Sequence, residues 1–270
     1  MKPNFSDRLR DLRTTKESVL CVGLDPDPPR IPTALKTGRS TESAVVAFCR
    51  SIVEATSDLA IAYKINFAFF ELLGAAAFDT IGTVLEAIPE GCLTIADAKR
   101  GDIGNSAGFY ARSVFETLGF DSVTVSPYMG RDSVDPFLTV PGTCAFVLAR
   151  TSNPGSHDFQ QLDIEGEPLY RRVALSAVNW GKESAGEAGL VVGATDTDDM
   201  AHLRQVLPDT PFLIPGVGAQ GGSAEDVMRA AGAGPVLINS SRAILYASGG
   251  TDFAEAARNQ AEHTCSLLGA

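Results

Sequence analysis

Short apolar runs alternate along this chain with longer amphipathic segments. The apolar runs are rich in Val, Ile and Leu, and they are too continuous to be half-exposed. This pattern is typical of parallel strands that are covered by helices. Eight such runs occur, at residues 19–25, 61–66, 93–99, 122–127, 144–150, 189–194, 211–217 and 235–242.

The segments between these runs place apolar residues three and four positions apart, which is the spacing of one helix face. Residues 42–58 and 252–268 show this spacing clearly. Eight strand–helix units without a break in composition predict one α/β domain over residues 1–270, a closed (β/α)₈ TIM barrel. An open, doubly wound sheet is the alternative.

Two of the predicted connections are long, and both follow the carboxyl end of a predicted strand. Residues 25–40 follow the first strand, and their prolines predict an extended, restrained path. Residues 151–168 follow the fifth strand. Loops at the carboxyl ends of barrel strands build active sites, so both segments are candidates for binding loops or lids.

Charged residues gather at the ends of the first three predicted strands. Asp25 ends the first, Lys64 nearly ends the second, and Asp97 and Lys99 end the third. Because strand side chains alternate between faces, Asp97 and Lys99 are expected to point the same way, toward the barrel mouth. A single residue of this kind is usually a solvated loop residue or a helix cap. Four residues of alternating sign predict a site, since buried charges are tolerated only in close pairs.

The segment after Lys99 has a purely structural alternative. Asp102 could favour the N-terminus of a following helix through the macrodipole, and Asn105 or Ser106 could cap that helix.

A phosphate site is predicted by a second pattern. Residues 214–222 form a glycine-rich turn directly after the seventh predicted strand, and Ser240, Ser241 and Arg242 end the eighth. Loops seven and eight commonly cradle a phosphate in such barrels, with backbone N–H groups facing the anion. Arg242 would add a bidentate contact.

Charge and composition indicate which partners, locations and cofactors to expect. The net charge of −11 disfavours nucleic acid and anionic membranes as partners. Lys64, Asn66 and Glu71 interrupt the most apolar window, and no signal peptide is evident, so we expect a cytoplasmic protein without a membrane span. The five scattered cysteines fit a reducing compartment. The three histidines lie far apart and no nucleotide-cofactor motif occurs, so neither a metal site nor a cofactor is predicted.

The motif Asp97-Ala-Lys99-Arg-Gly-Asp102-Ile103, with Lys64 upstream and PGVGAQGG downstream, resembles the orotidine 5′-phosphate decarboxylase family. The resemblance covers essentially the whole chain and is strongest to the longer bacterial branch of the family. It implies a cofactor-free homodimeric (β/α)₈ barrel. Such an enzyme decarboxylates orotidine 5′-monophosphate to UMP, the last step of de novo pyrimidine nucleotide biosynthesis.

The same resemblance implies catalytic roles. Asp25 and Lys64 would contact the ribose hydroxyls, Asp97 would lie against the substrate carboxylate, and Lys99 would protonate C6. Asp102 and Ile103 would reach into the neighbouring subunit's site.

It also implies binding residues. Ser106, where Thr is common in the family, would contact ribose, and Ser152 would bind the pyrimidine edge. The residues implied for the phosphate are Gln220, Gly221, Gly222, Ser241 and Arg242.

The implied chemistry explains why acid and base alternate. Loss of CO₂ leaves a vinyl carbanion at C6, which needs preorganised positive charge and a proton. Lys99 supplies both, and the flanking aspartates favour its charged form. Two alternatives remain. A metal-dependent sugar-phosphate decarboxylase or aldolase of the same superfamily would have an acidic residue in place of Lys64. A non-catalytic nucleotide-phosphate-binding barrel would have no use for Lys99 between two aspartates.

Overall fold

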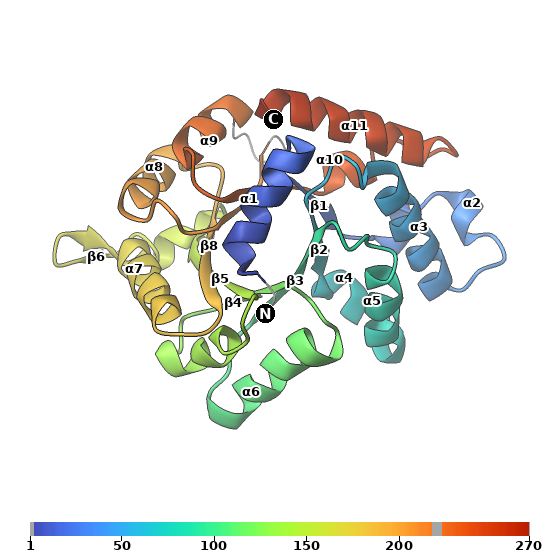
Figure 1. Cartoon of the computed structure of the whole chain (residues 1–270). Coiled ribbons are helices and arrows are strands. Elements are labelled where there is room, and N and C mark those ends of the chain that lie inside the picture. The colour runs from blue at the N-terminus through green and yellow to red at the C-terminus, as the bar shows by residue number, and fades with distance from the viewer. Residues whose placement is uncertain (1–2, 218–222, 270) are drawn as a thin grey trace. The chain divides into compact units, whose positions relative to one another are not determined.

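The computed structural model describes residues 3–217 and 223–269, and within these ranges eight strands close into a parallel barrel (Figure 1). Their order is β1-β10-β9-β8-β5-β4-β3-β2. The strands are β1 (Leu20–Leu24), β2 (Ala62–Asn66), β3 (Leu93–Arg100), β4 (Ser122–Val125), β5 (Cys144–Arg150), β8 (Glu187–Val192), β9 (Phe212–Pro215) and β10 (Val236–Ser240). The predicted barrel and its eight strands are therefore confirmed, and the open-sheet alternative is wrong.

Helices follow most strands, and the two helices predicted from apolar spacing are present as α3 and α11. The helices are α1 (Phe5–Lys16), α2 (Thr33–Lys36), α3 (Thr41–Thr56), α4 (Phe67–Glu71), α5 (Ala77–Leu85), α6 (Gly104–Arg112), α7 (Leu169–Lys182), α8 (Thr197–Val206), α9 (Ala224–Ala231), α10 (Arg242–Leu245) and α11 (Phe253–Leu268). Every residue of β1, β4 and β10 is buried. Such full burial explains why the strands read as continuous apolar runs rather than as alternating patterns.

The chain forms two compact units. Unit 1 comprises Met1–Asp11 and Ala98–Ile238, and unit 2 comprises Leu12–Asp97 and Asn239–Ala270. The boundary between Asp97 and Ala98 falls inside β3.

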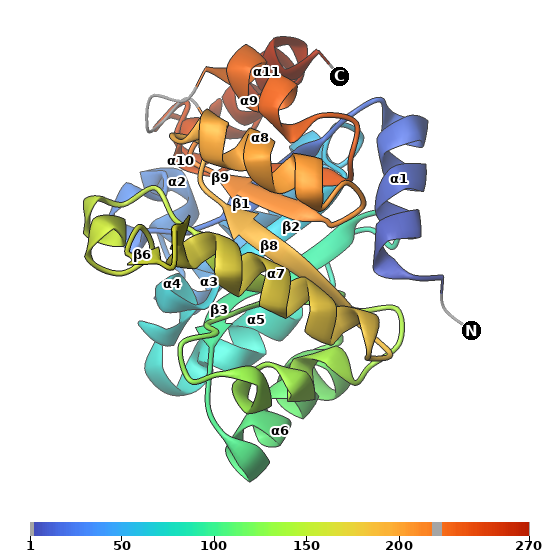
Figure 2. The same ribbon diagram turned by 90° about the vertical axis from the view of Figure 1, so that its left-hand side faces the viewer.

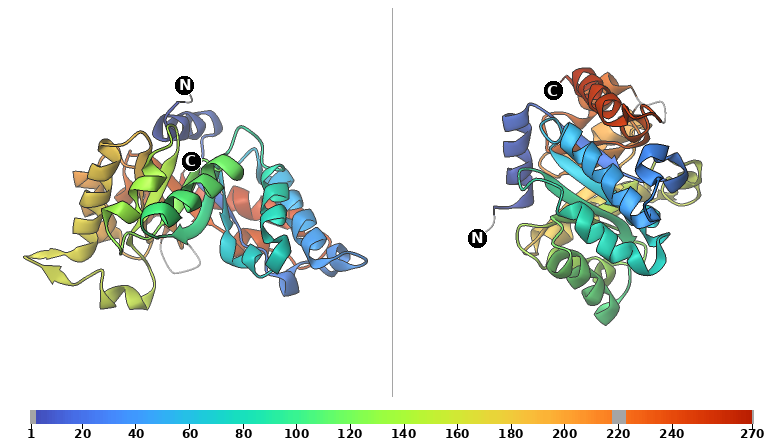
Figure 3. Two further views of the ribbon diagram at one scale, coloured as in Figure 1. Left: turned by 90° about the horizontal axis from the view of Figure 1, so that it is seen from below. Right: turned by 90° about the vertical axis from the view of Figure 1, so that its right-hand side faces the viewer.

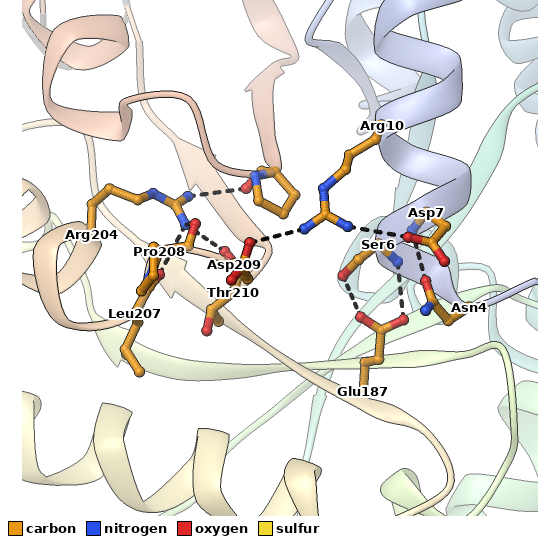
Figure 4. A network of polar contacts seen from close by, with 11 residues as sticks. Asn4, Ser6, Asp7, Arg10, Glu187, Arg204, Leu207, Pro208, Asp209 and Thr210 are labelled. Atoms are coloured by element: carbon orange, nitrogen blue, oxygen red, sulfur yellow. Dashed lines mark hydrogen bonds and ion pairs between the residues drawn. The ribbon is translucent and has the colours of Figure 1, made fainter.

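In unit 1, the amino-terminal part of α1 is fixed by both apolar and polar contacts. Phe5 is fully buried and packs edge-on against Phe146 of β5, with ring centroids 5.6 Å apart. Figure 4 shows that Ser6 faces Glu187, whose carboxylate accepts bonds from the Ser6 backbone N–H at 3.0 Å and from the Ser6 hydroxyl. Arg8 pairs with Asp121 at 2.8 Å. The sequence pattern did not predict this helix, because most of its residues are polar and only a few of them are buried.

Helix α7 lies against β8 in unit 1, as Figure 2 shows. The approach is close at Gly181, where an added Cβ would lie 2.7 Å from the Cβ of Ala188. Between β5 and α7, residues 151–168 are not a plain loop. They contain a 3₁₀ turn (Pro154–Asp158) and an antiparallel hairpin of β6 (Asp163–Ile164) and β7 (Glu167–Pro168), whose tip is visible in Figure 3. Positive φ at Glu165 and Gly166 suits a tight two-residue hairpin turn.

In unit 2, α3 and α5 lie side by side. The extended path expected for residues 25–40 is wrong, because this segment folds into a 3₁₀ turn (Pro28–Arg30) followed by α2. Pro28 and Pro29 occupy the first positions of that turn, where the fixed φ and the missing N–H of proline fit. The backbone N–H of Arg30 then donates to the carbonyl of Asp27 at 2.9 Å.

We expect Phe5→Ala to lower the free energy of unfolding by about 3–5 kcal/mol, because it leaves a cavity against Phe146. Urea denaturation of the variant measures this loss. Leu267→Ala, which trims a side chain that is 55% exposed, is the control and should change little. A Phe5→Ala loss no larger than the control's would show that α1 does not contribute to the core.

Candidate active site

A lysine is buried in unit 2 with two carboxylates around it. Lys64 on β2 is 5% exposed, and its Nζ donates to Oδ2 of Asp97 at 2.9 Å and lies 3.6 Å from Oδ1 of Asp25. Strand register accounts for this meeting, because Gly23 of β1 and Ile95 of β3 both lie opposite Lys64. Asp25 and Asp97 each follow two positions later, on the same face. The predicted grouping of Asp25, Lys64 and Asp97 is present.

The carboxylates determine the charge state of this lysine. Burial alone would lower the pKa of the Lys64 ammonium, but the negative charges of Asp25 and Asp97 outweigh burial and raise it above its usual value. Lys64 is therefore charged throughout the physiological pH range. The ammonium of Lys64 lies between the carboxylates of Asp25 and Asp97, so each carboxylate has the cation as its neighbour.

Asp25 begins a segment that is held by a side chain from far along the sequence. The hydroxyl of Tyr246 donates to the carbonyl of Asp25 at 2.9 Å and accepts from the backbone N–H of Asp27 at 2.6 Å. The guanidinium of Arg30 lies 3.7 Å from the centroid of the Tyr246 ring, and Phe48 stacks on that ring. Sequence reasoning missed Tyr246, because nothing in its local pattern links it to a strand end more than 200 residues earlier.

The end of β10 lies against β1. A Cβ added at Gly23 would meet Oγ of Ser241 at 1.8 Å and Oδ1 of Asn239 at 3.0 Å, so any larger residue would displace the Ser241 side chain. The backbone carbonyl of Ser241 accepts the N–H groups of Ile244 and Leu245, which fixes the start of α10. Arg242 is the first residue of α10, and it is exposed.

Lys99, in unit 1, has an unusual backbone for a strand residue. Its φ is +45°, in the left-handed region that side-chain-bearing residues rarely adopt. Its backbone N–H donates to Oγ1 of Thr124 at 3.0 Å, and its side chain is exposed. This backbone departs from the regular strand geometry on which the expected alternation of faces rests, and a common direction for Asp97 and Lys99 stays a prediction. Strain of this kind costs about 1–3 kcal/mol and collects at functional sites.

The residues after Lys99 lead into α6. Asp102 is half-buried, and its Oδ1 accepts from the backbone N–H of Ile103 at 2.8 Å. Helix α6 begins at Gly104, so Ser106 lies inside its first turn, and the alternative that Asn105 or Ser106 caps the helix is wrong. The side chains of Ile103 and Ser106 are exposed.

Ser152 lies two residues beyond Arg150, the buried last residue of β5, and is half-buried. The adjoining chain comes close, because a Cβ added at Gly193 would lie 2.9 Å from the Ser152 nitrogen. Arg150, at the end of β5, is 2% exposed and makes contacts that its place in an apolar run did not predict. Gln220, Gly221 and Gly222 lie outside the described residues.

The described part of the chain offers neither a cluster of metal ligands nor a membrane-spanning helix. No group of three or more His, Cys, Asp or Glu side chains there could hold a metal ion. In the same ranges, no helix is both long and apolar enough to cross a membrane.

Comparison with known proteins points to one family. Residues 18–258 match the family model described as "Orotidine 5'-phosphate decarboxylase / HUMPS family". A protein of Herpetosiphon aurantiacus named orotidine 5′-phosphate decarboxylase is 47% identical over 96% of this chain and 95% of its own length. A protein of the same name from Cupriavidus metallidurans is 48% identical over 96% of both chains. The solved structure of Leishmania donovani OMP decarboxylase is 38% identical, with a TM-score of 0.83 over 99% of this chain and all of that one.

We expect Lys64→Gln to lower the free energy of unfolding at pH 7 by about 3–5 kcal/mol, because it leaves two buried carboxylates without a cation. Buried carboxyl groups without a cation favour the protonated form. The folded variant would then bind protons more readily than the unfolded chain, so its deficit relative to the unsubstituted protein should shrink as pH falls from about 7 to 5.

Urea denaturation at both pH values measures the deficit of the Lys64→Gln variant. The control is Lys182→Gln, at an exposed lysine of α7, which should change little at either pH. An equal Lys64→Gln deficit at the two pH values would contradict the charge argument.

Proposed function

The chain belongs to the orotidine 5′-phosphate decarboxylase / HUMPS family and converts orotidine 5′-monophosphate to UMP, and we propose that Lys99 donates the proton to C6. The observation that carries this proposal is the buried Asp25–Lys64–Asp97 cluster, which ends two residues before a strained, exposed lysine. Losing CO₂ leaves a carbanion at C6, and Lys99 would supply both the stabilising charge and the proton.

Asp97 would act on the substrate carboxylate. Lys64 holds Asp97 in place at 2.9 Å, so a like charge is fixed near the group that leaves. Two unit charges at ~4 Å interact by about 4 kcal/mol at an effective dielectric constant near 20. The largest enzymatic accelerations need roughly 23 kcal/mol, so contacts to the rest of the substrate must supply most of the difference.

Those contacts would come from the ribose and phosphate sites. Among the described side chains, Oδ1 of Asp25 and Oγ of Ser241 are buried without a hydrogen-bond partner, which supports Asp25 as a ribose contact and Ser241 as a phosphate contact. Arg242, exposed at the start of α10, would add a charged contact to the phosphate. Gln220, Gly221 and Gly222 would complete the phosphate site, Ser106 would contact the ribose, and Ser152 would bind the pyrimidine edge.

We further propose a homodimer in which Asp102 and Ile103 complete the partner's site. Large apolar side chains are exposed in this region of unit 1, which supports an interface there. They are Ile103, Phe109, Tyr110, Tyr128 and Met129. The Arg100 guanidinium lies 5.3 Å from the Tyr110 ring centroid, and a Cβ at Gly101 would lie 3.7 Å from Cε of Met129, so both side chains border the 100–103 segment.

We also propose that the chain is a single catalytic domain and that the enzyme is cytoplasmic. The family match spans residues 18–258, which include most of both units, and this supports a single catalytic domain over residues 1–270. The five cysteines are all free and buried, which supports a cytoplasmic location.

We expect purified protein to remove the ultraviolet absorbance band of orotidine 5′-monophosphate in excess EDTA, because a lysine supplies the charge at C6. Lys99→Ala should lower kcat by about 10⁴-fold or more, since it removes both the proton donor and the positive charge. Turnover that appears only after magnesium is restored would instead favour a metal-dependent relative. A Lys99→Ala variant that is folded and fully active would overturn the role of Lys99.

We expect mixed subunits to complement each other if Asp102 acts across the dimer. Lys99→Ala and Asp102→Ala should each be nearly inactive alone, whereas a heterodimer of the two has one site with both residues intact. After random exchange at equal concentrations, about a quarter of the sites should be active. Activity that stays at the level of the separate variants, although mass measurement shows mixed dimers, would place Asp102 in its own subunit's site.

A further inference from the structure

Arg150, the last residue of β5, is a buried cation that joins three segments of unit 1. Its Nε donates to Oδ2 of Asp199 at 2.9 Å, and its Nη2 lies 2.6 Å from Oδ2 of Asp196. Its Nη1 donates to the carbonyl of Thr151 at 2.8 Å and to Oγ of Ser156 at 2.7 Å. A planar fork with donors on three nitrogens can make these contacts at once, whereas a single ammonium cannot.

The contacts of Arg150 reach both ends of the segment that carries Ser152. Thr151 is held further by Gln160, which accepts from the Thr151 backbone N–H at 2.8 Å and donates to Oγ1 of Thr151 at 2.8 Å. Ser156 is 4% exposed, so the arginine holds it inside the unit. Ser152 therefore lies between two residues whose positions depend on Arg150.

The segment that follows β8 also holds the chain near Ser152. The backbone N–H of Gly193 donates to the carbonyl of Arg150 at 2.8 Å, which keeps the segments after β5 and β8 together just beyond the end of β8. The register of β5 against β8 shifts between Leu148 and Arg150. A change of register at a strand end re-aims the side chains that follow it, and such interruptions are frequent next to functional sites.

The carboxylates that face Arg150 are themselves held. Asp196 is the residue before α8, and Asp199 lies in its first turn. The hydroxyl of Tyr170, on α7, donates to Oδ1 of Asp199 at 2.9 Å. Arg150 thus ties the Ser152 segment to the start of α8 and, through Asp199 and Tyr170, to the start of α7.

We propose that Arg150 is a positioning residue for the pyrimidine ring, acting through Ser152. This inference rests on the proposed function, which gives Ser152 the pyrimidine edge. Arg150 itself need not touch the substrate, because its guanidinium is 2% exposed and is engaged on all three nitrogens. Its effect is to place the serine hydroxyl, and a displacement of about 1 Å at such a contact can cost about a hundredfold in rate.

The test is a double-mutant cycle of Arg150→Lys with Ser152→Ala. We expect each single variant to lower kcat/KM by about ten- to a hundredfold. The double variant should be within about twofold of the worse single variant, because the arginine acts only through the serine that is already missing. Effects that multiply would overturn the proposal for Arg150 while leaving the role of Ser152 intact.

Two competitive inhibitors separate positioning from general damage. UMP carries the pyrimidine and ribose 5-phosphate does not. Arg150→Lys should therefore weaken the binding of UMP at least about tenfold and change the binding of ribose 5-phosphate by no more than about twofold. Equal weakening of both inhibitors would indicate a structural role and overturn the proposal. If Arg150→Lys does not fold, the test uses Tyr170→Phe, which removes the hydrogen bond that holds Asp199. This variant should also weaken UMP binding selectively, but by a smaller factor. Equal weakening of both inhibitors would again overturn the proposal.

The matched control is Arg204→Lys, at another buried arginine of unit 1 and on α8 itself. Figure 4 shows part of its contacts; its guanidinium donates to backbone carbonyls that include those of Leu207, Pro208 and Thr210. This variant should lose stability but bind both inhibitors as before. Ser152→Ala with unchanged kcat/KM would overturn the proposed role of Ser152 and, with it, this inference.

Discussion

The buried ammonium of Lys64 constrains this part of the molecule more than any other single group. An unpaired charge at 5% exposure would cost several kcal/mol, so the fold must bring Asp25 and Asp97 to it. Those carboxylates come from the ends of the two strands on either side of β2, and the observed register puts all three side chains on one face. A slip of one residue in either neighbour would turn its aspartate to the opposite face. The need to neutralise Lys64 therefore favours the observed strand register, and that register in turn brings the two carboxylates to Lys64.

A second buried cation solves a different problem. Lys64 and Arg150 each meet two carboxylates, but Lys64 is a compact charge that neutralises neighbouring strand ends. Arg150 uses a rigid fork to join a strand, a loop and the start of a helix. An ammonium suits a place where charge must be held close to a reacting group, and a guanidinium suits a place where backbone must be held in position.

The sequence predicted those features that depend on local pattern and strand periodicity. The eight strands and the meeting of Asp25, Lys64 and Asp97 follow from apolar runs and alternate faces, and the structure contains them. Tyr246 and Arg150 could not be given roles in this way, since their partners lie on other segments and are set by packing. The turn at 28–30 was missed because prolines that favour an extended path also suit the start of a 3₁₀ turn.

The backbone at Lys99 shows why the lysine that we propose as proton donor could not be placed by alternation alone. A regular strand continuing from buried Asp97 would carry the same pattern of faces through residue 99. The φ of +45° at Lys99 departs from the strand geometry that this pattern assumes. The bond from the Lys99 N–H to Thr124 and that from the Ser126 N–H to the Arg100 carbonyl, at 2.8 Å, hold the strained segment on both sides. Within two residues the chain thus passes from the buried carboxylate of Asp97 to the exposed side chain of Lys99, at a backbone whose strain is of the kind that collects at functional sites.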